Sequence, residues 1–119
     1  MPLPDLTRLY DGYVDTFRDA DGRLPEMMQL KRTHTACVVR NAALIADGEG
    51  FAPDAREAAL AAALLHDTGR YEQLRRYNTF RDSESVDHAV LSHEIVREKG
   101  WTDSPAVLDA VLWHNRRDL

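Results

Sequence analysis

The sequence predicts an all-α protein, a compact bundle of about five helices. Apolar residues recur three and four positions apart along most of the chain, as on one face of an amphipathic helix. Proline and glycine residues stand where these segments would begin and end. A run of alanine and leucine at residues 58–65 is apolar on all sides, which is typical of a buried helix. We expect the 119 residues to form a single domain.

The first two helices are predicted over residues 3–19 and from Pro25 to about Ala46. Residues 19–23 end the first helix, and residues 47–50 end the second. The first is amphipathic through Leu6, Leu9, Tyr10, Tyr13, Val14 and Phe17. One stripe of the second is expected to face inward, and it comprises Leu30, His34, Cys37, Val38, Asn41 and Ile45.

The third helix opens at Pro53 and ends near Asp67. Gly69 relaxes the backbone after it, and residues 71–77 are expected to form one short helix. Asn78 then begins a turn, since Asn tolerates the left-handed conformation better than most residues.

Two further helices complete the predicted bundle. Ser83 or Ser85 would cap a fourth helix that runs through Glu98. Ser104 and Pro105 suit the cap and first turn of a fifth. The apolar face of this last helix comprises Val107, Leu108, Val111 and Leu112, and His114 continues it.

Composition narrows the possible functions. The formal net charge of −5 argues against a nonspecific nucleic-acid binder, which would carry a basic surface. Cys37 is the only cysteine, so no internal disulfide can form, which fits a reducing cytoplasm. No apolar run approaches the roughly 18 residues of a membrane span, and the N-terminus lacks a secretory pattern. We therefore expect a cytoplasmic protein.

The dipeptide His66-Asp67 is the most informative feature of the chain. It ends the buried third helix, and burying a carboxylate there requires a compensating partner. A metal ion suits both groups at once. His34 and His114 lie on the inward faces of two other predicted helices, and helical bundles build metal sites from such facing side chains. The alternative is that each histidine is a hydrogen-bonded core residue.

The sequence leaves open which of two further histidines, His88 or His93, faces inward. His88 and His93 are five residues apart, so they point about 140° from each other on an ideal helix and are not expected to bind one ion together. Helical periodicity places His93 on the stronger apolar stripe with Val86, Ala89 and Val90.

An ordered set of motifs resembles the HD-domain superfamily of metal-dependent phosphohydrolases. Residues 31–35 with 41–42 resemble the helix that carries the family's first histidine, and residues 66–70 resemble its defining motif. Residues 77–80, 87–89 and 114–115 resemble the following segments of a bacterial branch, which would have glycine in place of Asn78. The resemblance covers roughly residues 28–116, and we take residues 26–116 as the motif-bearing region.

The resemblance implies a set of metal ligands. His34, His66 and Asp67 would bind one metal, and Asp67 would bridge to a second metal held by His88 and His114. It therefore favours His88 over His93, which becomes a hydrogen-bonded residue of the helical packing. Imidazoles with a carboxylate suit one or two divalent ions of Fe, Mn, Zn, Co or Ni.

The resemblance also concerns the end of the chain. The family has a further metal-binding Asp on a later helix, and Asp118 follows His114 too closely to match it. The chain is therefore expected to be truncated and incomplete at its C-terminus. The apolar face of the last helix would then be exposed, and we expect self-association through it.

The function implied is metal-dependent hydrolysis of a nucleotide or other small phosphate ester, with metal-activated water as the nucleophile. Asp67 would be catalytic as well as a ligand, and Arg70 would bind the substrate and stabilise negative charge on the phosphoryl group. The alternative for Arg70 is an ion pair with Glu72 or a helix end. Alternative functions are a di-iron oxygenase of the myo-inositol-oxygenase type and a catalytically inactive nucleotide-binding HD domain.

Overall fold

The regular structure is helical throughout residues 1–115, which the computed structural model describes. This confirms the predicted all-α class, with the short helix after His66-Asp67 as a sixth α-helix in the described part of the chain. The elements in chain order are α1 (Leu3–Asp15), α2 (Glu26–Gly48), α3 (Pro53–Leu65), α4 (Gly69–Tyr77), the 3-10 helix η1 (Asp82–Glu84), α5 (His88–Lys99) and α6 (Pro105–Trp113). Within those residues no helix combines the length and apolar character needed to cross a lipid bilayer.

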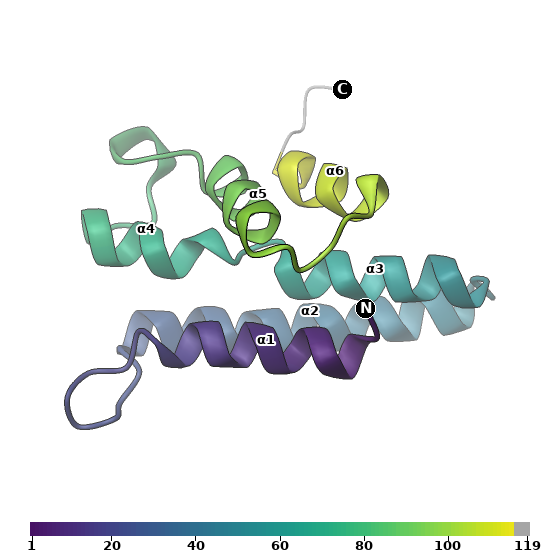
Figure 1. The fold of residues 1–119 in the computed structure, drawn as a ribbon, viewed down its shortest axis with the longest axis horizontal. Helices are drawn as coiled ribbons and strands as arrows, with labels where there is room; N and C mark the ends of the chain where they lie inside the picture. The colour runs from purple at the N-terminus through teal and green to yellow at the C-terminus, as the bar shows by residue number, and fades with distance from the viewer. Residues whose placement is uncertain (116–119) are drawn as a thin grey trace.

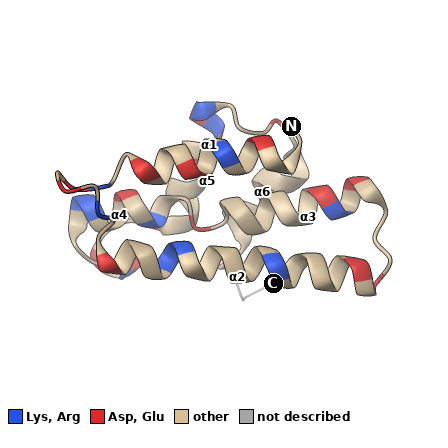
Figure 2. Ribbon diagram, turned by 90° about the horizontal axis from the view of Figure 1, so that it is seen from below, with Lys and Arg blue, Asp and Glu red and all other residues tan. Residues whose placement is uncertain are grey.

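The helices lie on two sides of a central row. α3 and α4 follow each other almost in line, with α1 and α2 on one side and α5 and α6 on the other (Figure 1). α2 packs along α3, while α5 contacts both α4 and α6, and α6 reaches α3. On α1 and α2 the acidic and basic residues are interspersed (Figure 2). The break between α3 and α4 therefore lies between the helices of the two sides.

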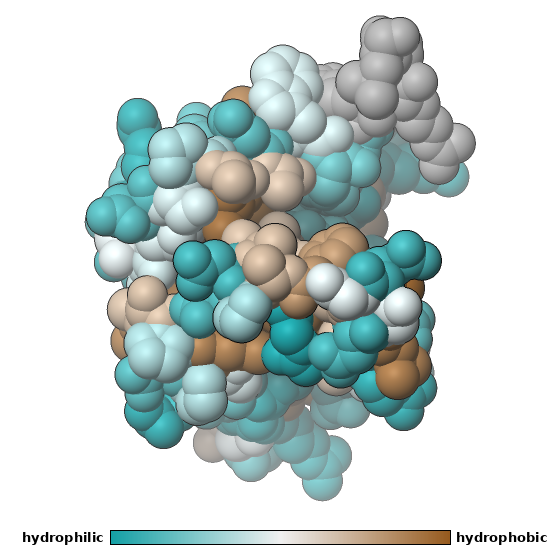
Figure 3. All heavy atoms as spheres, turned by 90° about the vertical axis from the view of Figure 1, so that its right-hand side faces the viewer, coloured by the Kyte–Doolittle hydropathy of each residue, from teal (hydrophilic) through white to brown (hydrophobic). Residues whose placement is uncertain are grey.

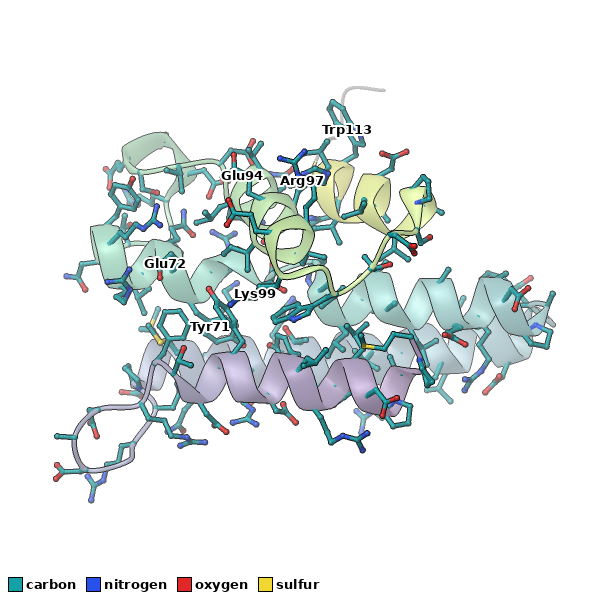
Figure 4. All side chains as sticks on the ribbon, viewed as in Figure 1. Tyr71, Glu72, Glu94, Arg97, Lys99 and Trp113 are labelled. Carbon is teal, nitrogen blue, oxygen red and sulfur yellow. The ribbon has the colours of Figure 1, made fainter. Side chains whose placement is uncertain are left out.

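Aromatic residues join α1 to the central row. Tyr71 extends from α4 toward α1 (Figure 4), and its hydroxyl lies 2.5 Å from that of Tyr10, with both side chains buried. Burial raises the pKa of both hydroxyls, so they stay neutral and share a hydrogen bond. Phe17 packs against Tyr71 at a ring-centre distance of 5.8 Å. Phe17 makes this contact from beyond α1, which ends at Asp15 and is shorter than the predicted residues 3–19.

The prediction of an inward-facing stripe on α2 is wrong. Leu30 and Ile45 are 58% and 60% exposed, and His34, Cys37 and Asn41 are also exposed. The buried residues of α2 are instead Met28, Thr35 and Ala46. The helix packs mainly along α3, and this contact buries few of its residues. Counting apolar residues around the helix therefore selected the wrong face.

The expected exposed patch on the last helix is also wrong. Val107 and Val111 are buried in the core, and Leu108 packs against it, because α6 covers α3 and α5. Trp113 points away from the helices (Figure 4). Apolar and hydrophilic patches adjoin each other at the end of the molecule where α2 joins α3 (Figure 3). Self-association stays a prediction, but the apolar face of α6 from which it was inferred is not exposed.

Local capping explains where the later helices begin and end. Asn78 ends α4 in the left-handed conformation with φ of 53°, as its residue type predicts. Ser104 caps α6 through the backbone N–H of Val107, as expected. The predicted cap of the fourth long helix is wrong. Asp87 caps α5 by accepting hydrogen bonds from two backbone N–H groups, while Ser83 lies in η1.

A close approach of α4 to α5 depends on Gly69. A Cβ atom at this position would lie 2.8 Å from the backbone N of Ser92 and 2.9 Å from the backbone O of His88. The Gly69 N–H donates to Ser92 Oγ at 2.7 Å, and that hydroxyl donates to the His88 carbonyl at 2.7 Å. One buried serine therefore links the start of α4 to the first turn of α5.

Substitution Gly69→Ala should destabilise the fold by about 1–3 kcal/mol, since two backbone atoms would have to move to admit the methyl group. Chemical denaturation monitored by circular dichroism measures the change. Gly12→Ala is the matched control, because a Cβ at Gly12 in α1 meets nothing within 4 Å. The control should be more stable than wild type by about 0.5–1 kcal/mol. Equal effects of the two substitutions would contradict the close-approach argument.

Candidate metal centre

Four helices deliver side chains to the break between α3 and α4. Asp67 lies in this break and is only 5% exposed. His66 ends α3, and His114 follows the last residue of α6. His34 comes from the middle of α2, and His88 is the first residue of α5. The residues predicted as metal ligands from distant parts of the sequence are thus brought together.

The two oxygens of the Asp67 carboxylate face different pairs of histidines. Oδ2 lies 3.3 Å from Nε2 of His66 and 3.7 Å from Nε2 of His34. Oδ1 lies 3.4 Å from Nε2 of His88 and 3.5 Å from Nε2 of His114. Each trio offers three ligand atoms within 4.8 Å of one another, close enough to hold one metal ion. Asp67 belongs to both trios and is the only residue they share.

Hydrogen bonds to the other ring nitrogen orient two of these histidines. Nδ1 of His66 lies 2.6 Å from the carbonyl O of Ala63, and Nδ1 of His114 lies 2.7 Å from that of Val111. A carbonyl oxygen can only accept, so Nδ1 carries the proton in each ring. The lone pair of a neutral ring is then on Nε2, which faces Asp67. This is the arrangement in which a histidine binds a metal.

The His88–His114 contact requires a positive charge between the rings. Their Nε2 atoms are 3.0 Å apart. Nδ1 of His88 lies 2.8 Å from Oδ2 of Asp82, so this ring also uses its Nδ1 proton outside the cluster. Two Nε2 lone pairs would repel each other at this distance unless a proton or a cation lies between them. A metal cation satisfies both rings, and the donor set therefore fits one.

The pKa values of Asp67 and His114 are both shifted in the direction that places positive charge beside the carboxylate. Burial alone would raise the pKa of Asp67, but hydrogen bonds with the rings of His114, His66 and His88 hold it well below its usual range. A ring that already carries a proton on Nδ1 can donate such a bond from Nε2 only as an imidazolium, so the positive charge beside Asp67 comes from a protonated ring or from a bound cation. Burial would likewise lower the pKa of His114, but hydrogen bonds to Asp67 and to the Val111 carbonyl raise it. The carboxylate is thus ionised and surrounded by imidazoles that compensate its charge.

His93 does not join this cluster. It lies on α5 and is half-buried, and its ring forms no hydrogen bond within residues 1–115, so the side-chain hydrogen bond expected for it is not present. His88 occupies the place beside Asp67 because it stands at the first residue of α5, where the helix meets the α3–α4 break. Asp118 lies outside the described residues.

Arg70 is held in place by one of its nitrogens. Nη1 donates to the carbonyl O of Phe80 at 2.7 Å and to Gln73 Oε1 at 2.9 Å, and lies 3.2 Å from Oδ1 of Asp82. Nε lies 3.9 Å from Oδ1 of Asp67 and is buried without a hydrogen-bond partner in the described part of the chain. The side chain is thus anchored on one edge and has an unused donor beside the histidine cluster.

The ion pair with Glu72 that was the alternative for Arg70 is not formed. Glu72 instead accepts hydrogen bonds from Arg75 and Arg76 on α4. The role of Arg70 in substrate binding stays a prediction.

Sequence reasoning missed Asp82. Its carboxylate accepts hydrogen bonds from Arg70, from Gln73 and from both the ring Nδ1 and the backbone N–H of His88. Burial would raise the pKa of Asp82, but the hydrogen bonds from His88 and Gln73 lower it. Asp82 belongs to a short 3-10 helix in which no periodic pattern separates it from other turn residues. Its separation of six residues from His88 was the only available signal, since histidine ligands often donate to a carboxylate.

The sequence was compared with protein families, curated proteins and solved structures. A family model described as HD domain matches residues 32–119, a span that contains all five residues of the cluster. No curated protein and no solved structure matched the chain.

Substitution Asp82→Asn should weaken metal binding by about 10- to 100-fold, because it removes the charge that orients His88 and its Nδ1 proton. Competition with a chromophoric chelator measures the affinity. Glu84→Gln is the control, since Glu84 lies in the same 3-10 helix but pairs only with the exposed Arg81. Wild-type affinity in Asp82→Asn would show that Asp82 does not support the centre.

Proposed function

Because the chain belongs to the HD-domain family, we propose that it is a metal-dependent phosphohydrolase that acts on a nucleotide or another small phosphate ester. HD domains are a group of the metal-dependent phosphohydrolase superfamily, and they bind divalent metals. One observation carries the proposal for this chain. The two oxygens of buried Asp67 face two separate pairs of histidines, so one carboxylate can serve two ligand groups.

The residues divide into two ligand groups on this proposal. His34, His66 and Asp67 would hold one ion, and Asp67, His88 and His114 a second. Neutral imidazoles with one carboxylate favour Fe, Mn, Zn, Co or Ni over Mg or Ca. Such an ion would supply Lewis acidity, which lowers the pKa of bound water to about 7 and polarises a phosphoryl oxygen.

The side chains of Asp67, Asp82 and Arg70 would each have a separate role in the reaction. Asp67 balances cationic charge while buried, and Asp82 keeps the Nδ1 proton of His88 outside the cluster. The guanidinium of Arg70 is fixed by hydrogen bonds to Phe80 and Asp82, so its free Nε can donate to a phosphoryl oxygen without first losing rotational freedom. Cys37 is exposed on α2 and outside the cluster, which leaves water as the nucleophile.

An oxygenase remains the second candidate because of the same donor set. Four imidazoles around a shared carboxylate suit two iron ions as well as they suit a hydrolytic pair. Iron content, an absorption band in the visible region and oxygen consumption would identify a di-iron oxygenase. A catalytically inactive domain would bind a nucleotide and hydrolyse nothing with any metal.

Substitutions His66→Ala and Asp67→Asn should each reduce bound metal at least about tenfold while helical content stays near wild type. Asp67→Asn is the sharper test, since it keeps the shape of the side chain and removes its charge. Elemental analysis gives the metal content, and circular dichroism gives the helical content. His93→Ala is the matched control, because it removes a histidine of α5 that lies outside the cluster. Full metal content in both cluster variants would refute the site.

Hydrolysis itself is tested with the wild-type protein loaded with each candidate metal in turn. We expect phosphate release from at least one class of phosphate ester, and its loss in Asp67→Asn. Metal binding without any phosphate release would refute the phosphohydrolase and leave the oxygenase and the inactive domain to be separated by the measurements above.

A further inference from the structure

A second cation, Lys31, accompanies Arg70 beside the cluster. Lys31 lies on α2 one turn before His34, and its Nζ is 3.9 Å from Oδ2 of Asp67. Arg70 approaches the other oxygen, with Nε 3.9 Å from Oδ1. The two cations thus flank one carboxylate, one on the side of each ligand group.

Both cations also lie near the ring of Phe80. Lys31 Nζ is 5.2 Å from the centre of the ring, and Arg70 Cζ is 5.6 Å from it. Such distances allow attraction between a cation and an aromatic ring. Phe80 is itself held, since its carbonyl accepts a hydrogen bond from Arg70. The ring of Phe80 therefore lies beside both positive groups, next to the histidine cluster.

Each of the two side chains has a donor that the described residues do not use. Nζ of Lys31 makes no hydrogen bond within residues 1–115, and Nε of Arg70 is a buried donor without a partner in that part of the chain. A distance of 3.9 Å to Asp67 is too long for a hydrogen bond. The Lys31 side chain is 24% exposed and that of Arg70 is 15% exposed, so an anion from solvent can reach the lysine, while Nε of Arg70 is covered by protein. Unsatisfied cationic donors of this kind call for an anion.

We propose that Lys31, Arg70 and Phe80 form a subsite for a terminal phosphoryl group, and that the substrate is a phosphate monoester or terminal nucleotide phosphate and not a diester. The inference rests on the proposed function and narrows it. A terminal phosphoryl group has three unesterified oxygens. Lys31 takes one, Arg70 takes another, and the third faces the histidine cluster. A diester offers only two such oxygens and would leave one of these partners unsatisfied.

The competing explanation is that Lys31 serves only as a counter-charge for Asp67. On that explanation, removal of Lys31 would disturb Asp67 and lower the metal content. The affinity for an anion would fall only as far as the metal content does. Other cations near the subsite are already paired, since Arg32 contacts Asp11 and Arg81 contacts Glu84. Lys31 is therefore the residue whose removal separates the two explanations.

The experiment compares Lys31→Met with wild type in binding inorganic phosphate and dimethyl phosphate. Isothermal titration calorimetry on the metal-loaded protein gives both affinities, and elemental analysis gives the metal content. Lys99→Met is the matched control, because it removes the same charge from the distal end of α5, where Lys99 lies over Tyr13 (Figure 4). Lys31→Arg tests rescue by a retained positive charge.

We expect wild type to bind phosphate at least about tenfold more tightly than dimethyl phosphate. Lys31→Met should lose about tenfold in phosphate affinity with unchanged metal content, while Lys99→Met and Lys31→Arg stay near wild type. Loss of metal in Lys31→Met, or unchanged phosphate affinity, would overturn the subsite, as would equal binding of the two anions by wild type. Phosphate binding through Lys31 in a protein that hydrolyses no ester would support the subsite and contradict the proposed function.

Discussion

The burial of one carboxylate constrains the rest of this structure. Asp67 stays ionised although it is almost fully covered, and an uncompensated charge in such a place would cost several kcal/mol. The fold supplies the compensation from four helices, each of which places a histidine Nε2 within 3.7 Å of the carboxylate. The same clustered ring nitrogens could serve as ligands, so the arrangement around Asp67 also fits a metal ion.

The backbone around the cluster is arranged to keep this geometry. Gly69 lets α4 approach α5 so closely that its N–H donates a hydrogen bond to Ser92, whose hydroxyl in turn donates to the His88 carbonyl within α5. Asp82 then ties the ring of His88 to the anchored side chain of Arg70. A displacement of α5 would have to break both connections at once. The position of His88 is therefore determined by several weak interactions acting together and by close packing, which tolerates little movement.

Local signals in the sequence were enough to predict the helices and part of the cluster. Proline, serine and asparagine at helix ends act through the nearest backbone groups, which explains the correct placement of Ser104 and Asn78. The contribution of Asp82 could not be predicted in the same way, because its side-chain partners lie on two other helices, α4 and α5. The buried face of α2 was missed because it depends on which neighbours cover the helix, and periodicity measures only the helix itself.

The two ligand groups differ in how firmly the protein holds them. His88 is 6% exposed and bonded to Asp82, while His34 is 49% exposed and makes no ring hydrogen bond within residues 1–115. An ion held by His88 and His114 would meet a preformed site, whereas His34 can turn on the surface of α2. Lys31 lies on the same open side as His34. Substrate access from this side would bring a phosphoryl group to Lys31 and the adjustable ligand together, while the buried half keeps Asp67 in place.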